Sequence, residues 1–308
     1  MPGRMSRKKL SGAESAEEKD PCAGVDWNLV WRERHVRHQG SEGFLDSLHV
    51  WDREENAERY DRIARSEYSR RVEETIAGLP ITPSSRVLDI GAGPGTLAIP
   101  LSPLVREITA VEPAAGMTGV LRRRLEEEKI GNIRVVPATW EEVDPARDLD
   151  GPYDLVIASL SLSMPDIREA IEKMVSVASG SIHLFWFVDP PFWEKSYSAT
   201  WPALHGVPFS PGPKADCLFM VLTQMGIYAD VQMRVLDKRY RFSSRDEMYN
   251  HFRTRFGVKD SRQEKVMREY LDGVAMEEGR ALKISGDSVY AWLHWEPGEA
   301  RSGNFPAA

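Results

Sequence analysis

The chain of 308 residues carries a formal net charge of −7 and has 42% hydrophobic residues, so we expect a soluble globular protein with a large core. The acidic balance argues against a broad nucleic-acid-binding surface, and no apolar run approaches the roughly 18 residues of a membrane span. The cysteines Cys22 and Cys217 are too few for a disulfide framework or a structural zinc site, and the basic start lacks the apolar core of a signal peptide, so we predict a cytoplasmic protein without a metal.

The segment before the main domain divides into a tail and a helical region. Residues 1–24 are polar and mixed in charge, which predicts a disordered tail. Residues 25–80 are predicted to form a helical lid followed by a lead-in helix over 55–79, where apolar side chains recur at intervals of three and four. The tryptophans of this region either pack on the main domain or close over a cofactor.

Residues 86–96 read RVLDIGAGPGT, a short apolar run followed by three alternating glycines, Gly91, Gly93 and Gly95. A strand that enters a glycine-rich turn brings bare backbone close to a ligand. The spacing differs from the dinucleotide fingerprint G-x-G-x-x-G, because Thr96 stands where that pattern has its last glycine. A carboxylate at Asp89 would also repel a pyrophosphate and attract a cationic amine or sulfonium.

The pattern D-x-G-x-G-x-G resembles motif I of the class I S-adenosylmethionine (SAM)-dependent methyltransferases. Roughly 20 residues further on, a second apolar run ends in Glu112, at the spacing where an acid meets ribose hydroxyls in NAD enzymes and in methyltransferases alike. The resemblance implies SAM as the cofactor and S-adenosylhomocysteine (SAH) as the product. The implied cofactor-binding residues are Asp89, Gly91, Ala92, Gly93, Gly95, Glu112, Pro113, Met117, Thr139, Trp140, Ser159 and Leu160.

Within that resemblance, each residue has an expected role. Asp89 would fix the turn and attract the amino-acid end of SAM, Glu112 would hold the ribose and Met117 would pack on the adenine. At the adenine position the chain departs from the commoner Gly-Asp-Ala form, so Thr139 or the backbone would make the contact, with Trp140 stacking nearby.

The chain after the glycine turn alternates helices and strands. A short or kinked helix is expected over 96–105, because Pro100 and Pro103 interrupt it. Another helix follows, and strands are predicted over 133–136, 153–159 and 181–188, with intervening helices that give a doubly wound sheet. Ser159 and Leu160 end the second of these strands, where an open α/β sheet presents its ligand crevice.

Residues 189–192 read DPPF, which resembles the Asp/Asn-Pro-Pro-aromatic motif of amino-methyltransferases. In those families the motif follows the fourth strand, whereas here it follows the fifth, so we favour a proline-stiffened exit from the sheet. Trp193, Tyr197, Trp201 and His205 then recur every four residues on one helix face. They form either core packing or an aromatic pocket wall, which would favour a flat or cationic acceptor.

The last part of the chain is expected to complete the sheet and to cap the site. A helix over 215–225 leads to a strand over 231–242, and the final strand is placed at 288–295. Between these strands, the sequence predicts a helical insertion over about 243–285, opened by Ser244 as a helix cap. Residues 299–308 are expected to fray.

These observations predict an α/β protein with a doubly wound, seven-stranded, Rossmann-like methyltransferase sheet, helices on both faces and a helical cap from the N- and C-terminal regions. The methyltransferase domain would span 81–298. The expected function is methyl transfer from SAM to a small molecule by in-line displacement in an enclosed pocket, without a membrane partner. The alternatives are a protein or nucleic-acid (amino) methyltransferase, a catalytically silent SAM-fold binding subunit, and a nucleotide-binding oxidoreductase.

The acceptor side of the site is less defined by the sequence. Tyr60 matches a tyrosine that borders the transfer pocket in related small-molecule enzymes, although core packing would explain it as well. With Asp189, Trp193 and Tyr197 it makes up the predicted substrate pocket. No catalytic base is assigned, and Asp189, Tyr197 and His205 are conceivable ones.

Overall fold

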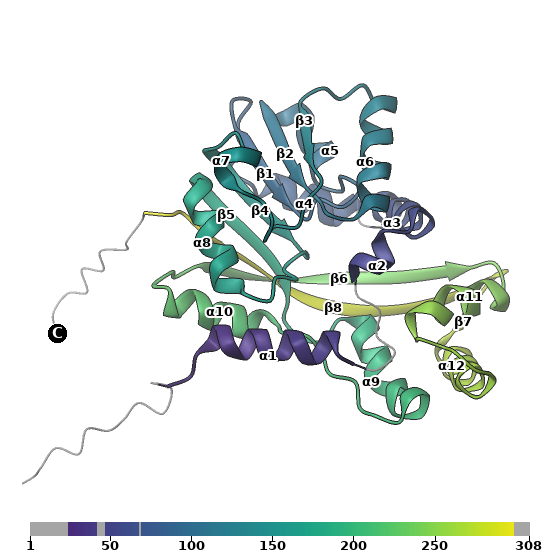
Figure 1. Cartoon of the computed structure of the whole chain (residues 1–308). Coiled ribbons are helices and arrows are strands. Elements are labelled where there is room, and N and C mark those ends of the chain that lie inside the picture. The colour runs from purple at the N-terminus through teal and green to yellow at the C-terminus, as the bar shows by residue number, and fades with distance from the viewer. Residues whose placement is uncertain (1–23, 42–46, 68, 299–308) are drawn as a thin grey trace, which may run out of the picture.

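The computed structural model describes residues 24–41, 47–67 and 69–298. The tails predicted at 1–24 and 299–308 lie outside the described residues, apart from residue 24. A single twisted sheet runs through the molecule with the strand order β3-β2-β1-β4-β5-β8-β6 (Figure 1). Its parallel half and its antiparallel half carry different helices.

The parallel half confirms the predicted doubly wound arrangement. Its strands pair in parallel, and they are β1 (Arg86–Ile90), β2 (Glu107–Val111), β3 (Ile133–Val136), β4 (Tyr153–Ser159) and β5 (Ala178–Phe187). In β4, Leu155 and Ile157 face one side of the sheet while Val156 and Ala158 face the other, and all four side chains are buried. Helices must therefore cover both faces, as in α/β proteins generally.

The antiparallel half is a pair of long strands, β6 (Asp230–Phe242) and β8 (Ala281–Trp295), with β8 also paired to β5. We call β6 and β8 the hairpin, although helices are inserted between them in the sequence. The last strand begins at Ala281, earlier than predicted, because Leu282 and Ile284 are buried against the cap helices. The short β7 (Met276–Glu278) pairs with β8 beside this path, so the sheet has eight strands among the described residues where seven were expected. The inserted segment accordingly ends near residue 280.

Two sets of helices cover the sheet. One face packs against α1 (Trp27–Gln39), α8 (Ile167–Val177) and α10 (Ala215–Gln224), and the other against α3 (Glu54–Glu67), α4 (Ser69–Ala77) and α5 (Ala98–Leu101). The helix predicted over 55–79 is thus α3 and α4. The remaining elements of this half are α2 (Ser47–Trp51), the 3-10 helix η1 (Ser102–Leu104), α6 (Ala115–Glu127) and α7 (Pro145–Asp148).

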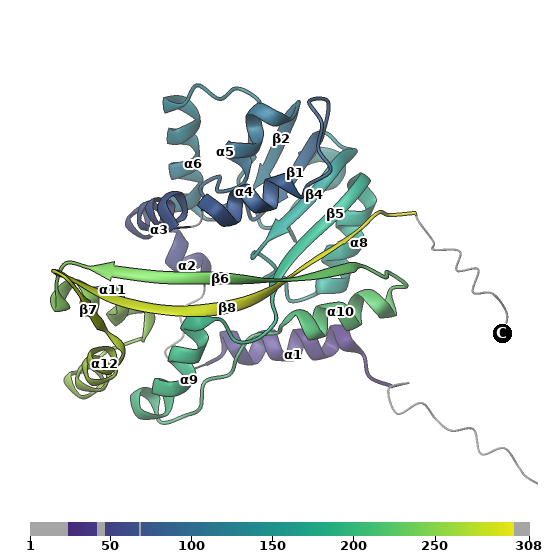
Figure 2. The same ribbon diagram turned by 180° about the vertical axis from the view of Figure 1, so that it is seen from behind.

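The far end of the hairpin has a core of its own. It packs against α9 (Phe192–His205), α11 (Arg245–Arg255) and α12 (Ser261–Val274), below the hairpin in Figure 2. Ser244 caps α11 by accepting a hydrogen bond from the Glu247 amide, as the sequence predicted. The helical cap therefore sits on the hairpin, and the hairpin holds it beside α2 and α3 (Figure 1).

Candidate active site

The glycine turn joins the end of β1 to the end of β2. The Gly91 and Ala92 amides donate to the Val111 carbonyl at 2.8 and 3.1 Å. Gly91 and Gly93 have φ angles of +70° and +58°, which glycine adopts without strain. A Cβ at Gly91 would lie 2.3 Å from the Ser161 Cβ, whereas a Cβ at Gly93 would point into open space. Gly93 therefore presents bare backbone toward room that a ligand can occupy.

Glu112 follows β2 and ties the turn to the next helix. One carboxylate oxygen accepts a hydrogen bond from the Gly93 amide at 2.8 Å, and the other accepts from the Ala114 amide at 2.9 Å. Each carboxylate oxygen can accept a further donor. The side chain is thus oriented by backbone and still able to receive two ribose hydroxyls.

Asp89 and Glu112 form a pair of buried carboxyl groups behind the turn. Asp89 is 2% exposed, and burial, followed by the nearby charge of Glu112, raises its pKa to about 7. Burial also raises the pKa of Glu112, although the two amide hydrogen bonds oppose that shift. A bound cation would stabilise both ionised carboxylates, and a phosphate would be repelled. The two carboxylates therefore fit the positively charged ammonium and sulfonium groups of SAM.

The end of β4 closes the other side of the turn. The Ser161 hydroxyl donates to the Ile90 carbonyl at 2.6 Å, and the Leu160 amide donates to the Phe185 carbonyl at 3.0 Å. Leu160 has a φ of +59°, which is costly for a leucine and marks a constrained bend at the sheet edge. The Ser159 hydroxyl accepts a hydrogen bond from the guanidinium of Arg71.

The N-terminal segment covers the start of α6. Met117 is buried beneath Trp51 and Tyr60, whose rings meet edge to face with centroids 5.3 Å apart. The approach is close, because a Cβ at Gly116 would lie 2.4 Å from the Trp51 carbonyl oxygen. Asp52 also accepts a hydrogen bond from the Ala115 amide at 2.9 Å.

The N-terminal tryptophans divide between the two predicted roles. Trp31 is fully buried on the opposite face of the sheet, where its indole N–H donates to the Met164 carbonyl at 2.8 Å. Trp27 packs partly buried against the same core. Trp51 alone of the three lies against the residues around the glycine turn. Core packing thus accounts for α1, and α2 provides the cover.

The predicted adenine contacts lie in different surroundings. The Trp140 side chain is 3% exposed, and its indole N–H donates to the Ala170 carbonyl at 3.0 Å beneath α8. This corrects the expectation of a stacking ring, because the indole is committed to the core. The Thr139 hydroxyl donates to Glu142 at 2.9 Å and is partly exposed. Pro113 is partly buried between Glu112 and α6.

The aromatic stripe on α9 lies in the cap core. Tyr197 and Trp201 are buried, with ring centroids 5.3 and 5.2 Å from that of Phe209. The pocket-wall hypothesis is therefore wrong for these residues. Trp193 packs edge-on against Phe187 at 5.1 Å, which gives it a packing role as well.

Two proposed bases are also held in structural contacts. Asp189 follows β5, which fits the proline-stiffened exit, and its carboxylate lies 2.7 Å from the Lys195 ammonium. His205 makes a hydrogen bond through Nε2 to the Phe256 carbonyl at 2.9 Å. Neither interaction leaves the group directed at the glycine turn.

A basic recess beside Tyr60 was not predicted from the sequence. Its walls come from α3, β6 and α11, and they include Arg59, Tyr240, His251 and Arg255. Tyr60 lines the recess. It also contacts Thr96 and lies near enough to Glu112 to be affected by its charge, so the recess adjoins the glycine turn. No local sequence pattern connects these residues, since they lie on three separate elements.

Two further searches cover only the described part of the chain. There, no helix is long and apolar enough to cross a membrane. Across the same residues, no group of three or more His, Cys, Asp or Glu side chains could hold a metal ion.

Known proteins resemble the chain in part of its sequence and in its fold. Residues 87–179 match a family model described as a methyltransferase domain. The chain is 34% identical over 93 residues to a protein-L-isoaspartate O-methyltransferase of Erwinia tasmaniensis, covering 30% of this chain and 42% of that protein. It is 39% identical over 56 residues to a ribosomal RNA small subunit methyltransferase A of Desulforapulum autotrophicum, covering 18% and 20% respectively.

The fold has a solved counterpart. The structure of a proposed methyltransferase from Bacillus halodurans C-125 matches 73% of this chain and 98% of its own, with a TM-score of 0.51 and 14% identity. At that identity the likeness shows the fold alone. The chain spans less than half the length of the curated relatives it matches.

Proposed function

We propose that the chain, whose residues 87–179 match a methyltransferase domain, transfers a methyl group from SAM to a small-molecule acceptor. The observation that carries the cofactor assignment is the pairing of two buried carboxylates, Asp89 and Glu112, with the partly exposed glycine Gly93, whose Cα faces open space. Bound SAM would supply a methyl group already activated by its sulfonium.

The residues of the turn would hold the cofactor in a fixed place. Asp89 would attract the amino-acid end, and Glu112, oriented by two amides, would accept the ribose hydroxyls. Trp51 offers apolar surface at the start of α6 for the adenosine, and the buried Met117 supports it from below. Because the sulfonium needs no further activation, these residues would act by alignment and by excluding water.

The position of the neighbouring recess supports a small acceptor. It lies between α3 and the cap, directly beside Tyr60, and its walls come from α3, β6 and α11. A narrow recess between these elements would not admit a folded protein surface. The net charge of −7 likewise disfavours a nucleic-acid acceptor.

A protein acceptor is the second candidate, because the curated relatives include protein-L-isoaspartate O-methyltransferases. Those matches cover about a third of this chain, and the family model ends at residue 179, before the hairpin and its cap helices. The hairpin and the cap, which would select the acceptor, thus lie outside the family model.

Calorimetric titration with SAM, SAH and NADH, on the wild type and on Asp89→Ala, tests the cofactor. We expect SAM and SAH to bind the wild type and to be lost or strongly weakened in the variant. Binding of NADH alone would assign the chain to the oxidoreductases. Transfer of labelled methyl groups from SAM to small-molecule, protein and RNA fractions of a cell extract then separates the acceptor classes, and SAH binding without any transfer would indicate a silent binding subunit.

A further inference from the structure

The recess beside Tyr60 has a strongly one-sided chemistry. Two guanidinium groups, Arg59 and Arg255, line it together with His251, and its remaining walls are Asn56, two tyrosines and Ile63. No carboxylate is among these lining residues. Glu247, whose charge acts on Arg59, is exposed and accepts hydrogen bonds from the Ser243 amide and hydroxyl.

Hydrogen bonding fixes what the recess can offer a ligand. A guanidinium of Arg59 lies 3.0 Å from Nδ1 of His251. Arginine is always protonated and can only donate, so Nδ1 is the acceptor and the proton of the neutral imidazole is on Nε2. The recess is therefore lined by guanidinium and imidazole N–H donors, which suit an anion.

Aromatic rings hold the second guanidinium in place. The Arg255 guanidinium lies 5.9 Å from the centroid of Trp51, the ring that covers the start of α6. Arg255 also donates to the Tyr197 hydroxyl in the cap core. The cap therefore places a partly buried cation next to the cover of the cofactor site.

A third guanidinium, that of Arg71 on α4, acts on Tyr60 from outside the recess. Arg71 donates to the Ser159 hydroxyl at the end of β4. Among the described residues, the buried Nε of Arg71 has no hydrogen-bond partner. This donor marks a further place for an acceptor oxygen at the end of β4, separate from the one between Arg59 and Arg255.

From these contacts we propose that the acceptor is an anion, whose carboxylate or phosphate group is bound in the recess by Arg59 and Arg255. This inference rests on the proposed function and specifies its substrate class. Only about 10 Å³ of the recess is wide enough for a water molecule in this structure, so binding requires the Arg59 and Arg255 side chains to turn outward and admit the ligand. The anion replaces the contact between Arg59 and His251 with a charge-assisted one.

Calorimetric titration of the SAH complex with matched probes tests the proposal. The anions are benzoate, phenylacetate and phenyl phosphate, and the neutral counterparts are benzamide, phenylacetamide and benzyl alcohol. We expect at least one anion to bind about tenfold more tightly than its counterpart, with the carboxylates and the phosphate separating the two sources of charge. Arg59→Gln and Arg255→Gln should each weaken that binding by about tenfold.

The matched control is Arg268→Gln. Arg268 also covers an aromatic ring, that of Tyr249 at 4.5 Å, but it belongs to α12 and does not line the recess. It should leave anion binding unchanged. Arg59→Gln keeps the test valid if Arg255→Gln fails to fold.

Three outcomes would overturn the inference. They are equal binding of the neutral counterparts, anion binding that survives both substitutions, and the absence of any anion binding while SAH binds normally. In the last case the arginines only clamp α3 to α11. If the wild-type protein does not bind SAH at all, the proposed function is refuted, and this result is distinct from the three that overturn the charge of the acceptor.

Discussion

The two sides of Tyr60 carry opposite charge. On the sheet side, Asp89 and Glu112 form a buried pair of carboxylates behind the glycine turn. On the cap side, Arg59 and Arg255 line the neighbouring recess. The acidic side is built from residues close together in the sequence, whereas the basic side is assembled from α3 and α11, far apart along the chain. The comparison assigns a cationic cofactor to one side and an anionic acceptor to the other.

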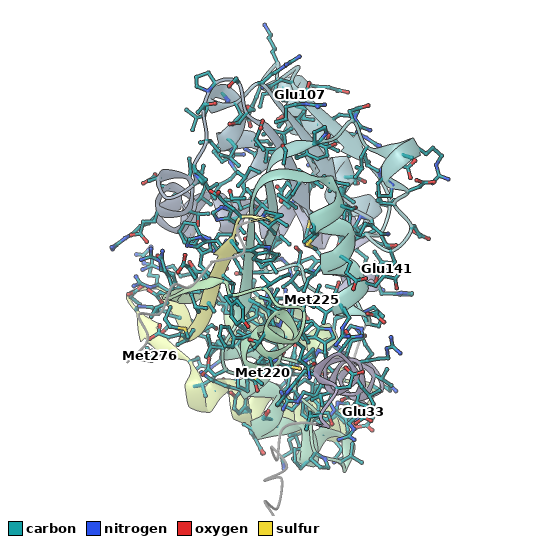
Figure 3. All side chains as sticks on the ribbon, turned by 90° about the vertical axis from the view of Figure 1, so that its left-hand side faces the viewer. Glu33, Glu107, Glu141, Met220, Met225 and Met276 are labelled. Atoms are coloured by element: carbon teal, nitrogen blue, oxygen red, sulfur yellow. The ribbon has the colours of Figure 1, made fainter. Side chains whose placement is uncertain are left out.

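Removing the acid that orients the turn should have the largest effect. Glu112→Ala deletes the acceptor of two backbone amides and of the proposed ribose hydroxyls, so we expect SAH affinity to fall on the order of 100-fold. Glu107→Ala is the matched control, since Glu107 begins the same strand at the far end, where Figure 3 labels it, and pairs with Arg86. Equal SAH affinities in the two variants would show that Glu112 does not contribute to cofactor binding.

The packing of Trp51 against α6, which covers the acidic side, should be disrupted by adding one methyl group at Gly116. Gly116→Ala places a Cβ against the Trp51 carbonyl oxygen, so it should destabilise the fold by about 1–3 kcal/mol and weaken SAH binding. Gly119→Ala, in the same helix, meets nothing within 4 Å and should stabilise by about 0.5–1 kcal/mol. Chemical denaturation measures both, and a shift of the same sign for the two variants would contradict the tight contact between α2 and α6.

The charge of the acidic side should be visible in the pH dependence of binding. Because the pKa of Asp89 is about 7 and a cationic ligand favours its ionised form, SAM affinity should fall as pH drops below 7, by at most about tenfold per pH unit. In Asp89→Asn this dependence should flatten. Calorimetric titrations between pH 5 and 8 measure it, and a wild-type profile as flat as that of the variant would refute the assignment.

The same group should lower stability at neutral pH. Its folded-state pKa lies above the ordinary value of 3.8, so its contribution to stability is present at low pH and is lost as pH rises through 7. Asp89→Asn should therefore raise the free energy of unfolding at pH 8 by roughly 1 kcal/mol or more, and the difference should vanish below pH 4. An unchanged difference across this range would mean that the carboxylate is not destabilised by burial.

The smallest effect is expected in the DPPF segment of residues 189–192, which resembles an amino-methyltransferase motif. Asp189 belongs to neither side of Tyr60, and its exposed ion pair with Lys195 is worth less than about 1 kcal/mol. Asp189→Asn should leave SAH affinity and methyl transfer within about twofold of wild type. A loss of transfer with normal SAH binding would restore the amino-methyltransferase hypothesis.

Local patterns in the sequence determined the parallel half of the fold and the acidic side of the site. The apolar runs predicted β1 to β5, and Asp89 and the glycines are spaced within a single turn, where backbone geometry depends on neighbours in the chain. The position of Glu112 followed from the same strand–helix alternation. Such features are encoded by residues a few positions apart, so they are visible without a structure.

Tertiary structure alone decided the acceptor side. Arg59 and His251 are 192 positions apart and meet only because the β6–β8 hairpin carries α11 back to α3. Tertiary structure also distinguished between residues with similar local patterns. Trp31 is buried in the core, whereas Trp51 covers the start of α6. Tyr197 and Trp201, which share one helix face, are buried in the core of the cap. A helical period shows which side chains share a face, but the element packed against that face determines whether they line a site.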